Sequence, residues 1–595
     1  MSNTTQTFDT TKSALLGYDY QGASDRLKLL VFSAFESIRL YMPDTFQSDW
    51  GLYLIFGLYL WDWIDGWLSL RYARRYLPFP VPPREEAKYA PSDVSIVVPT
   101  VDWDDNLVDN LRTWLICQPR EIIFVTTNAQ QPKLLHLFNT APGLREELYR
   151  GRVHFHIRTV QQANKRLQLC AGINEAKGKI VALVDDDARW TSEEVLTTLL
   201  APFQNDDVGL VGGSIESYIP EERQRSDVIT GWEVAALRTR SKRRAGNRAF
   251  FEADGSTNFT VSGLTMLLRA EIVKDPYFQH HFINDMWNGI RQNTGDDGFI
   301  TRYVLFQHHL RHVGDAGPLR RTPWKLGMQF GPGGTVQTSL LTTGEYAQQS
   351  RRWYRSGLRL RLTLLLWEPG LFKFFRTTPY MARKMTGGML SPIFNLVRLG
   401  LWLWLWWHDP TMAELLFLYI LSNYVSSLRA FCREFPYVGI KNIWAVILAD
   451  HAYLISDIFS WCSLSLESWS NRSSVDVGEE EGNVDEVAVS QAPPPRNPQA
   501  SQPQAPQTFT GPAGKSIYEV SAEEFYAPLP NRPASQAPQE FYGFPASPSQ
   551  PATKNVAFPK EPMPDFTTGF LPMEETWMED QNDKNFWAPF QPQQK

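Results

Sequence analysis

The stretch Ile180-Val-Ala-Leu-Val-Asp-Asp-Asp187 contains the strongest local signal for the fold of this chain. Five consecutive apolar residues without polar alternation are typical of a strand buried on both faces of a parallel sheet. Three carboxylates follow at once, and open α/β sheets bind ligands beyond the carboxyl ends of their strands. The stretch therefore predicts a buried strand that delivers Asp185, Asp186 and Asp187 into a binding crevice.

Similar short β-rich runs precede it, separated by segments with helical periodicity. Strands are expected at Val94–Pro99, Glu121–Val125 and Val153–Ile157, and helices at Asp105–Leu115 and Arg166–Ala176. Alternation of this kind predicts a doubly wound α/β domain.

Length and charge restrict the classes of protein that need considering. A chain of 595 residues exceeds one ordinary hydrophobic core. The net charge of -6 comes from the end of the chain, where the residues from Arg472 onward carry 17 acidic and 8 basic side chains. The remainder is only slightly basic, so no nucleic-acid partner is expected. Four cysteines far apart in sequence predict neither zinc ligation nor a disulfide framework.

Aromatic and aliphatic residues gather in segments long enough to cross a bilayer. The first is Trp50–Leu70, in which Asp62 and Asp65 share one helical face and are expected to face protein or water. The basic residues after it, Arg71, Arg74, Arg75 and Arg84, predict that this end is cytosolic.

A second group of apolar segments follows the α/β region. Three spans are expected, at Leu390–Trp407, Met412–Phe431 and Ile443–Leu466, with Asp450 and Asp457 on one face of the last. The sequence thus predicts a multi-pass protein of the plasma membrane. Its expected parts are a polar segment with an interfacial helix (1–49), a transmembrane helix (50–70), a cytosolic catalytic domain (90–357), interfacial amphipathic helices (358–389), about three transmembrane helices (390–466) and a disordered acidic Pro/Gln/Ser-rich tail (472–595) that is a candidate docking segment for other proteins.

Three short motifs carry the expected chemistry. The triplet Asp185–Asp187 suits a hard cation, Mg²⁺ or Mn²⁺, together with a nucleotide diphosphate. Thr294-Gly-Asp296-Asp297, before a helical stretch, offers a carboxylate that accepts a proton from an attacking hydroxyl. Gln349-Ser-Arg-Arg352-Trp353 offers guanidinium donors for a diphosphate and an indole platform for a sugar. Taken singly, the first two also fit helix caps and the third a basic turn beside a membrane.

The order of these motifs between membrane segments resembles the processive membrane synthases of glycosyltransferase family 2, such as hyaluronan, chitin and cellulose synthases. The resemblance covers roughly residues 90–470. It is closest to the hyaluronan-synthase-like, capsular-type polysaccharide synthases of fungi, because of the Gly295-Asp296-Asp297 form and the Thr260-Val-Ser262-Gly263 loop.

The resemblance implies a GT-A type nucleotide-sugar-binding domain flanked by membrane helices, a UDP-sugar donor and a growing glycan acceptor. It assigns Asp297, with Asp296, to catalysis and Asp185 and Asp187 to the metal. Acceptor contacts would come from Trp353, Ser262 and Gly263. Donor contacts would come from Asp102, Lys165, Arg166, Asp185, Asp186, Gln349 and Arg352.

The second expected strand departs from the family pattern, because it continues Phe124-Val-Thr-Thr-Asn128 where relatives carry acidic residues near the nucleotide base. Recognition of uracil therefore falls more heavily on Asp102. Two alternatives stay open from the sequence: a non-processive transferase that glycosylates a lipid, and a membrane scaffold with an inactive transferase domain.

Overall fold

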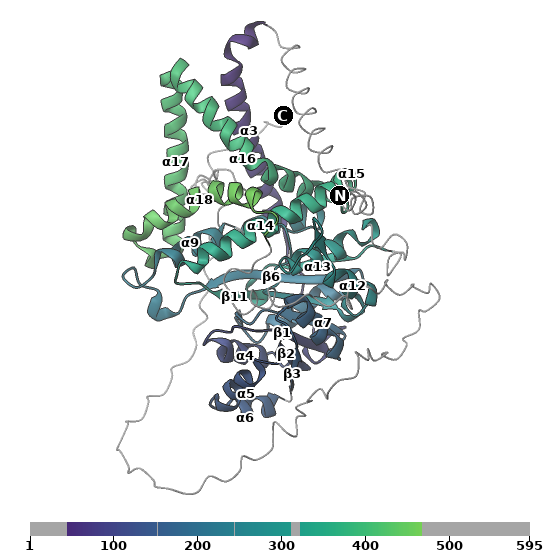
Figure 1. The fold of residues 1–595 in the computed structure, drawn as a ribbon. Coiled ribbons are helices and arrows are strands. Elements are labelled where there is room, and N and C mark those ends of the chain that lie inside the picture. Colours follow the sequence, from purple (N-terminus) through teal and green to yellow (C-terminus); the bar gives the residue numbers. More distant parts are fainter. Residues whose placement is uncertain (1–43, 152, 243, 311–321, 467–595) are drawn as a thin grey trace, which may run out of the picture. The chain divides into compact units, whose positions relative to one another are not determined.

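The computed structural model describes residues 44–466, except 152, 243 and 311–321 (Figure 1). The interfacial helix predicted within residues 1–49, at positions 27–41, and the predicted tail 472–595 lie outside the described residues. The chain divides into two units, one of residues 1–61 with 396–417, the other of residues 62–395 with 418–595. The larger unit contains all the expected site residues.

In the described ranges, nine strands form one mixed sheet, in the order β3-β2-β1-β4-β7-β6-β11-β5, with β10 also paired to β6. Two further strands, β8 and β9, form a hairpin. The strands are β1 (Val94–Pro99), β2 (Glu121–Thr127), β3 (His154–Val160), β4 (Ile180–Val184), β5 (Ala188–Trp190), β6 (Val208–Tyr218), β7 (Thr265–Arg269), β8 (Met286–Trp287), β9 (Ile290–Arg291), β10 (Lys325–Gln329) and β11 (Thr335–Ser339).

The helices alternate with these strands and then continue beyond the sheet. They are α3 (Asp44–Arg75), α4 (Leu107–Leu115), α5 (Gln131–Thr140), α6 (Leu144–Gly151), α7 (Lys165–Glu175), α8 (Val195–Leu200), α9 (Gly231–Ser241), α10 (Arg244–Asp254), α11 (Ala270–Val273), α12 (Pro276–Ile283), α13 (Asp296–Phe306), α14 (Glu345–Leu366), α15 (Leu371–Thr377), α16 (Pro379–His408), α17 (Pro410–Glu434) and α18 (Ile443–Cys462).

The predicted doubly wound domain is confirmed. Strands β3, β2, β1 and β4 are mutually parallel, and helices cover both faces of this part of the sheet (Figure 1). Ile96 and Val98 of β1 pack into the core below α4, α5 and α6, whereas Val97 packs with α7 and α13. Since successive strand residues point to opposite faces, this division explains why the strand is apolar without alternation.

Close approach of α7 to the sheet requires glycine at two positions. A Cβ on Gly172 would lie 2.4 Å from a methyl of Val97, and one on Gly178 would lie 2.6 Å from the carbonyl oxygen of Asp93. Neither distance is possible for a real side chain. These glycines therefore set the distance between α7 and β1, which positions Lys165 at the start of the helix.

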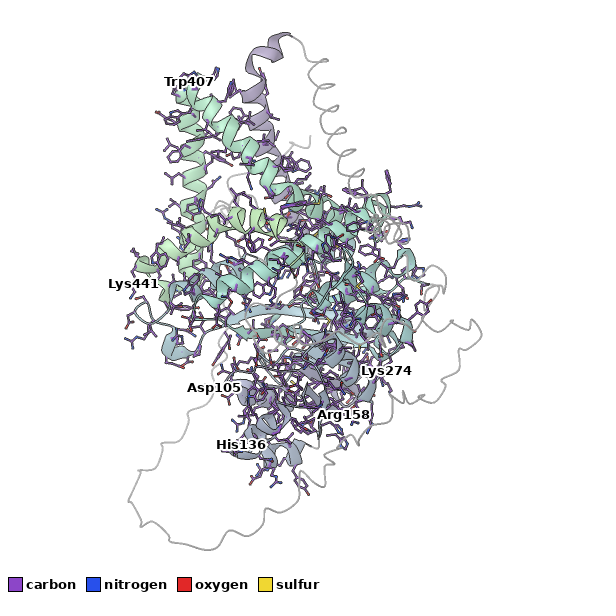
Figure 2. The ribbon with its side chains drawn as sticks, in the orientation of Figure 1. Asp105, His136, Arg158, Lys274, Trp407 and Lys441 are labelled. Carbon is purple, nitrogen blue, oxygen red and sulfur yellow. The ribbon has the colours of Figure 1, made fainter. Side chains whose placement is uncertain are left out.

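Two described helices, α16 and α17, are long and apolar enough to cross a membrane, and a third span is added if the bent pair Ile440–Ala452 and Leu454–Cys462 forms one. The exposed side chains on α16 and α17 include Leu403, Trp407 and Phe417, and Trp407 is labelled in Figure 2. Helix α3 contains the predicted 50–70 span but does not belong to this set. Its Trp, Tyr and Asp residues lower its mean hydropathy. The prediction of a span rested on the length of the segment, which does not reflect this.

Two aspartates of the predicted spans, Asp65 and Asp450, face protein, as expected. Asp65 forms ion pairs with Arg383 and Lys384 of α16. Asp450 of α18 accepts from Arg238 at 3.0 Å and from Lys242 at 2.5 Å, both at the end of α9. These pairs join the catalytic unit's own helices to the segments that carry the apolar spans.

The predicted interfacial region 358–389 is divided between α14, α15 and the start of α16. Helix α14 buries Arg359, whose guanidinium donates to the carbonyls of Leu464 and Leu466, so this helix packs within the protein. The short α15 instead leaves Leu371, Phe372 and Phe375 exposed beside Lys373 and Arg376. Of the described helices in this region, α15 has the composition expected of a membrane-surface segment.

Glu121, at the amino end of β2, provides a test of this packing. Its buried carboxylate accepts from Ser95 Oγ at 2.5 Å and from the Lys177 N–H at 2.6 Å, and lies 3.5 Å from His156. Burial acts to raise the pKa of Glu121, but the bonds from His156, Ser95 and Lys177 outweigh it and lower the pKa to about 2. A lowered carboxyl pKa stabilises the fold above the unfolded value, and the gain is lost as the pH falls.

We therefore expect Glu121→Gln to reduce stability at pH 7 by about 1–3 kcal/mol, because a charged acceptor is replaced by a neutral one. Thermal unfolding of the solubilised full chain at pH 7 and at pH 4 measures this effect. The difference from wild type should shrink at pH 4. An equal difference at both values would contradict the assigned ionisation.

Candidate functional site

The site forms where β1 and β4 separate, at the point where the order of the parallel strands reverses. The register pairs Val94 with Ile180 and Val97 with Leu183. Continued beyond the strands, it places Thr100 opposite Asp186, and Thr100 Oγ1 donates to Asp186 Oδ2 at 2.7 Å. Such a topological switch point is where open α/β sheets bind nucleotides.

Asp186 is the structural member of the aspartate triplet. Its side chain is buried against Thr100, and its carbonyl accepts from Asn110 Nδ2 of α4 at 3.1 Å. Asp102, beyond the end of β1, is exposed at the same edge. Of these two predicted donor contacts, Asp102 is therefore the accessible one.

Asp185 and Asp187 are directed by strands from later in the chain. The β4–β7 register places Leu264 opposite Asp185, whose N–H donates to the Leu264 carbonyl at 3.1 Å. Thr338 of β11 pairs with Ala188 of β5, and its Oγ1 donates to Asp187 Oδ2 at 2.8 Å. β7 therefore fixes the backbone of Asp185 and β11 the carboxylate of Asp187, and both residues remain partly exposed.

Lys165 connects the triplet to the second acidic motif. Its Nζ lies 2.9 Å from Asp185 Oδ1 and 3.0 Å from Asp296 Oδ2. It is the first residue of α7, where the helix dipole disfavours a cation, so the carboxylates must supply the compensating attraction. Burial lowers the pKa of Lys165, but Asp185 and Asp296 outweigh it and raise the pKa overall.

The acidic pair at the start of α13 has two different environments. Burial raises the pKa of Asp296, but Lys165 and Arg166 outweigh it and lower the pKa. Burial, followed by repulsion from Asp296, raises the pKa of Asp297 to about 6, although Lys165 and the N–H groups of Gly298 and Gly263 act against it. Two adjacent carboxyl groups whose pKa values are pushed apart are typical of an acid–base site.

Burial likewise raises the pKa of Asp185 to about 6, with Lys165 opposing and Asp187 and Asp296 adding to the shift. Like charges are thus crowded on both sides of Lys165. A ligand that brings positive charge to this edge relieves that repulsion.

The Ser262-Gly263 loop reaches this cluster through the antiparallel β7. A Cβ on Gly263 would lie 3.5 Å from Lys165 Nζ and 3.6 Å from Asp297 Cβ. Ser262 is partly exposed and its Oγ accepts from the Leu264 N–H at 3.3 Å. The predicted acceptor-side residues therefore lie beside the predicted base.

Helix α14 contains the Gln349–Trp353 motif and packs against the segment that leads to Asp296 and Asp297. Ser356 Oγ donates to Thr294 Oγ1 at 3.3 Å, just before the Gly295-Asp296-Asp297 turn. Gln349 and Arg352 precede Ser356 by seven and four residues, so they share its helix face. Trp353 is partly buried, with the guanidinium of Arg240 5.6 Å from its ring.

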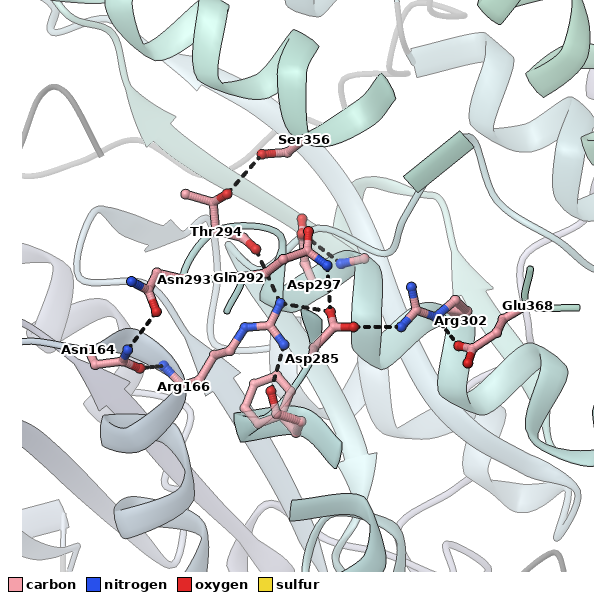
Figure 3. A network of polar contacts seen from close by, with 12 residues as sticks. Asn164, Arg166, Asp285, Gln292, Asn293, Thr294, Asp297, Arg302, Ser356 and Glu368 are labelled. Atoms are coloured by element: carbon pink, nitrogen blue, oxygen red, sulfur yellow. Dashed lines mark hydrogen bonds and ion pairs between the residues drawn. The ribbon is translucent and has the colours of Figure 1, made fainter. Parts of the chain in front are cut away.

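Arg166 lies away from the opening of the site. Its side chain is 1% exposed and donates to the carbonyls of Phe282 and Thr294 and to Asp285 (Figure 3). Its sequence-based role was donor binding. In the structure, the Arg166 side chain is hydrogen-bonded to the loop before α13.

Several residues at the site were not singled out from the sequence: Thr100, Asp104, Thr338 and Asp285. Burial, opposed by Asn106 and supported by Asp187 and Asp186, raises the pKa of Asp104, which places this carboxyl near the triplet. Its position two residues after Asp102 was the only available signal. Thr338 had none, since only the β11–β5 register brings it to Asp187.

The donor set fits a divalent cation that takes most of its ligands from elsewhere. Among the described residues no three His, Cys, Asp or Glu side chains are grouped to hold an ion. Asp185 and Asp187 nevertheless supply carboxylate oxygens at one edge. Mg²⁺ sites commonly use one or two carboxylates, with phosphates and waters completing the shell.

The sheet order, the switch-point aspartates and the acid–base pair define a GT-A type fold of the kind that uses nucleotide sugars. Residues 91–356 match the family model described as glycosyltransferase like family 2. The chain belongs to this family.

Similar proteins are also named as glycosyltransferases. The chain is 31% identical over 419 residues to the NDP-glycosyltransferase ltbB of Aspergillus luteorubrus, covering 70% of this chain and 96% of that protein. It is 32% identical over 311 residues to a type 2 glycosyltransferase of Zymoseptoria tritici, covering 51% and 59%. A mannosyltransferase from Pyrobaculum calidifontis, solved with GDP-Man and Mn²⁺, aligns with a TM-score of 0.40 at 14% identity, covering 69% of this chain and 97% of that one.

We expect Lys165→Gln to lower the rate of nucleotide release from sugar nucleotides by at least about 100-fold, because removing one partner leaves buried carboxylates without their cation. The measurement is a coupled assay of nucleotide release on membranes. Lys179→Gln is the matched control, since Lys179 pairs with Asp93 at the opposite end of the strands and is 69% exposed. Equal rates in both variants would contradict a role for Lys165.

Proposed function

We propose that the protein is a membrane-integrated, inverting family 2 glycosyltransferase that transfers a sugar from a UDP-sugar to a growing glycan. The observation that carries the proposal is the position of Lys165 between Asp185 and Asp296. It joins the carboxylates suited to a diphosphate to the acidic pair suited to deprotonating an acceptor. Membrane integration and coupled export are proposed from the apolar α16 and α17 and from the ion pairs that connect α9 to α18.

In this proposal Asp297 is the general base. With its pKa raised to about 6, it is mostly ionised at neutral pH and still able to accept a proton, and its neighbour Asp296 is held ionised by Lys165. The acceptor hydroxyl gives its proton to Asp297 as its oxygen bonds to the anomeric carbon. The bond between that carbon and the diphosphate oxygen breaks with its electrons on the leaving diphosphate, which inverts the anomeric centre.

The donor is bound by the edge of the sheet and by α14. Asp102 is accessible for the base or ribose, whereas Asp186 fixes the switch point through Thr100. Arg352 and Gln349 are proposed to contact the diphosphate, since they lie on the α14 face that meets the Thr294–Asp297 turn. Trp353, Ser262 and Gly263 are proposed to bind the acceptor.

Asp187 and Asp185 would hold the divalent cation, Mg²⁺ or Mn²⁺. When bound, the cation neutralises charge that develops on the leaving diphosphate. Thr338 orients Asp187 through its 2.8 Å hydrogen bond. We propose that the catalytic unit lies on the cytosolic side of the plasma membrane, as the basic residues at the end of α3 favour.

A second candidate is single transfer to a lipid or other small acceptor. The chain covers 96% of a relative named only NDP-glycosyltransferase, and that name specifies no polymer. Incubating membranes with a panel of UDP-sugars and sizing the product separates the two functions. A ladder of lengthening glycan supports the synthase, including the hyaluronan-synthase-like form, whereas a single added sugar supports the alternative.

Asp297→Asn should abolish transfer, with a loss of at least about 100-fold, because general-base catalysis typically contributes that much. Nucleotide-diphosphate affinity should stay within about 2-fold of wild type, because the proposed contacts to the diphosphate are made by other residues. In the wild type the rate should rise with pH through about pH 6, where Asp297 is half ionised, and level off at higher pH. Rates measured between pH 5 and pH 8 test this, and retained activity in the variant would exclude Asp297 as the base.

Thr338→Val should raise the Mn²⁺ concentration for half-maximal activity by about 10-fold, since loss of a hydrogen bond to a metal ligand weakens metal binding. The rate at saturating Mn²⁺ should change little. Thr140→Val is the control, because that hydroxyl only donates to carbonyls on the exposed side of α5. Activity that resists a chelator would contradict the metal assignment.

A further inference from the structure

Asp285, a buried carboxylate outside the three sequence motifs, is hydrogen-bonded to the segment that leads to Asp296 and Asp297. Asp285 follows α12 and precedes β8, and its side chain is 10% exposed. It accepts from Arg166 Nη2 at 3.2 Å, from Gln292 Nε2 at 3.1 Å and from Arg302 Nη2 at 3.0 Å (Figure 3). Its three partners belong to α7, to the residue after β9 and to α13.

Two of those partners are guanidinium groups withdrawn from water. The side chains of Arg166 and Arg302 are 1% and 5% exposed. Arg302 also lies 3.5 Å from Glu368, just after α14, while the only ion pair recorded for Arg166 among the described residues is with Asp285. A buried cation requires a nearby counter-charge, so Asp285 neutralises Arg166 and shares the neutralisation of Arg302 with Glu368.

The β8–β9 hairpin begins just after Asp285 and ends just before Gln292, which is hydrogen-bonded to Asp285. Met286 pairs with Arg291 and Trp287 with Ile290, and the Gln292 N–H donates to the Asp285 carbonyl at 2.8 Å. The chain therefore leaves Asp285 and comes back to the same point before continuing to Asp296.

Each of the three residues between this hairpin and Gly295 is tied to a different part of the protein. Gln292 is bound to Asp285, Asn293 accepts from Asn164 at 2.8 Å, and Thr294 bonds to Arg166 and Ser356 (Figure 3). Asp285 is common to this set, because it fixes Gln292 directly and Thr294 through Arg166.

We propose that Asp285 is a positioning residue that sets the location of Asp296 and Asp297 by neutralising Arg166 and Arg302. The proposal rests on the proposed function, in which Asp297 is the base. Asp285 touches none of the donor-side groups, namely Thr100, Asp185, Asp187 and Thr338. Its loss should therefore impair the chemical step and spare donor binding.

The test is Asp285→Asn in the full-length membrane protein, which keeps the shape and removes the charge. We expect kcat to fall about 10–100-fold, since displacements of about 1 Å in a catalytic group have effects of this size. The donor KM and the affinity for UDP should stay within about 2-fold of wild type, because uniform binding is unchanged.

Glu121→Gln is the matched control, because it also removes a buried carboxylate charge with several donors, but at the amino end of β2. It should lower the unfolding temperature and leave kcat unchanged. An unchanged kcat in Asp285→Asn, or an equal loss in Glu121→Gln, would each overturn the proposal.

A second variant covers the case in which Asp285→Asn does not fold. Arg302→Lys keeps the charge and loses the forked geometry, and should lower kcat about 3–10-fold at constant donor KM. Wild-type kcat in this variant would overturn the proposal. Failure of the proposed function itself is a different result, since it appears as activity retained by Asp297→Asn.

Discussion

The ion pairs of Lys165 with Asp185 and Asp296 are the interaction on which the rest of the site depends. Four carboxyl groups, those of Asp185, Asp187, Asp296 and Asp297, lie at one edge of a largely buried sheet. Without a cation among them, repulsion and burial would favour either protonation or a wider separation. Lys165 occupies a helix start that disfavours positive charge, so the carboxylates and the cation hold each other in place.

Strand register explains how residues far apart in sequence meet around this cation. The β1–β4 register brings Thr100 to Asp186, β7 brings the Ser262-Gly263 loop to Asp297, and β11 brings Thr338 to Asp187. A slip of one residue in any of these pairings would turn the side chain to the other face. The precision of the site is thus a property of the sheet, fixed partly by the glycines that let α7 approach it.

Local patterns were enough to predict the parallel half of the sheet, because a strand buried on both faces has a continuous apolar run. They also indicated the acidic motifs, since carboxylates after such a run point to a binding edge. They could not identify Thr338 or Asp285, whose partners depend on long-range register and on a hairpin of four paired residues with no periodicity of its own. Helix α3 is not among the described helices that are apolar enough to cross a membrane, because its tryptophans, tyrosines and aspartates offset its leucines.

The adjacent residues Lys165 and Arg166 show why the two basic side chains are not interchangeable here. The compact ammonium of Lys165 fits between single oxygens of two carboxylates. The planar guanidinium of Arg166 instead spreads its donors over the carbonyls of Phe282 and Thr294 and the carboxylate of Asp285. One cation joins the donor-side carboxylates to the acidic pair, and its neighbour fixes the loop that delivers that pair. The start of α7 therefore determines both the electrostatics of the site and the position of the residue proposed as its base.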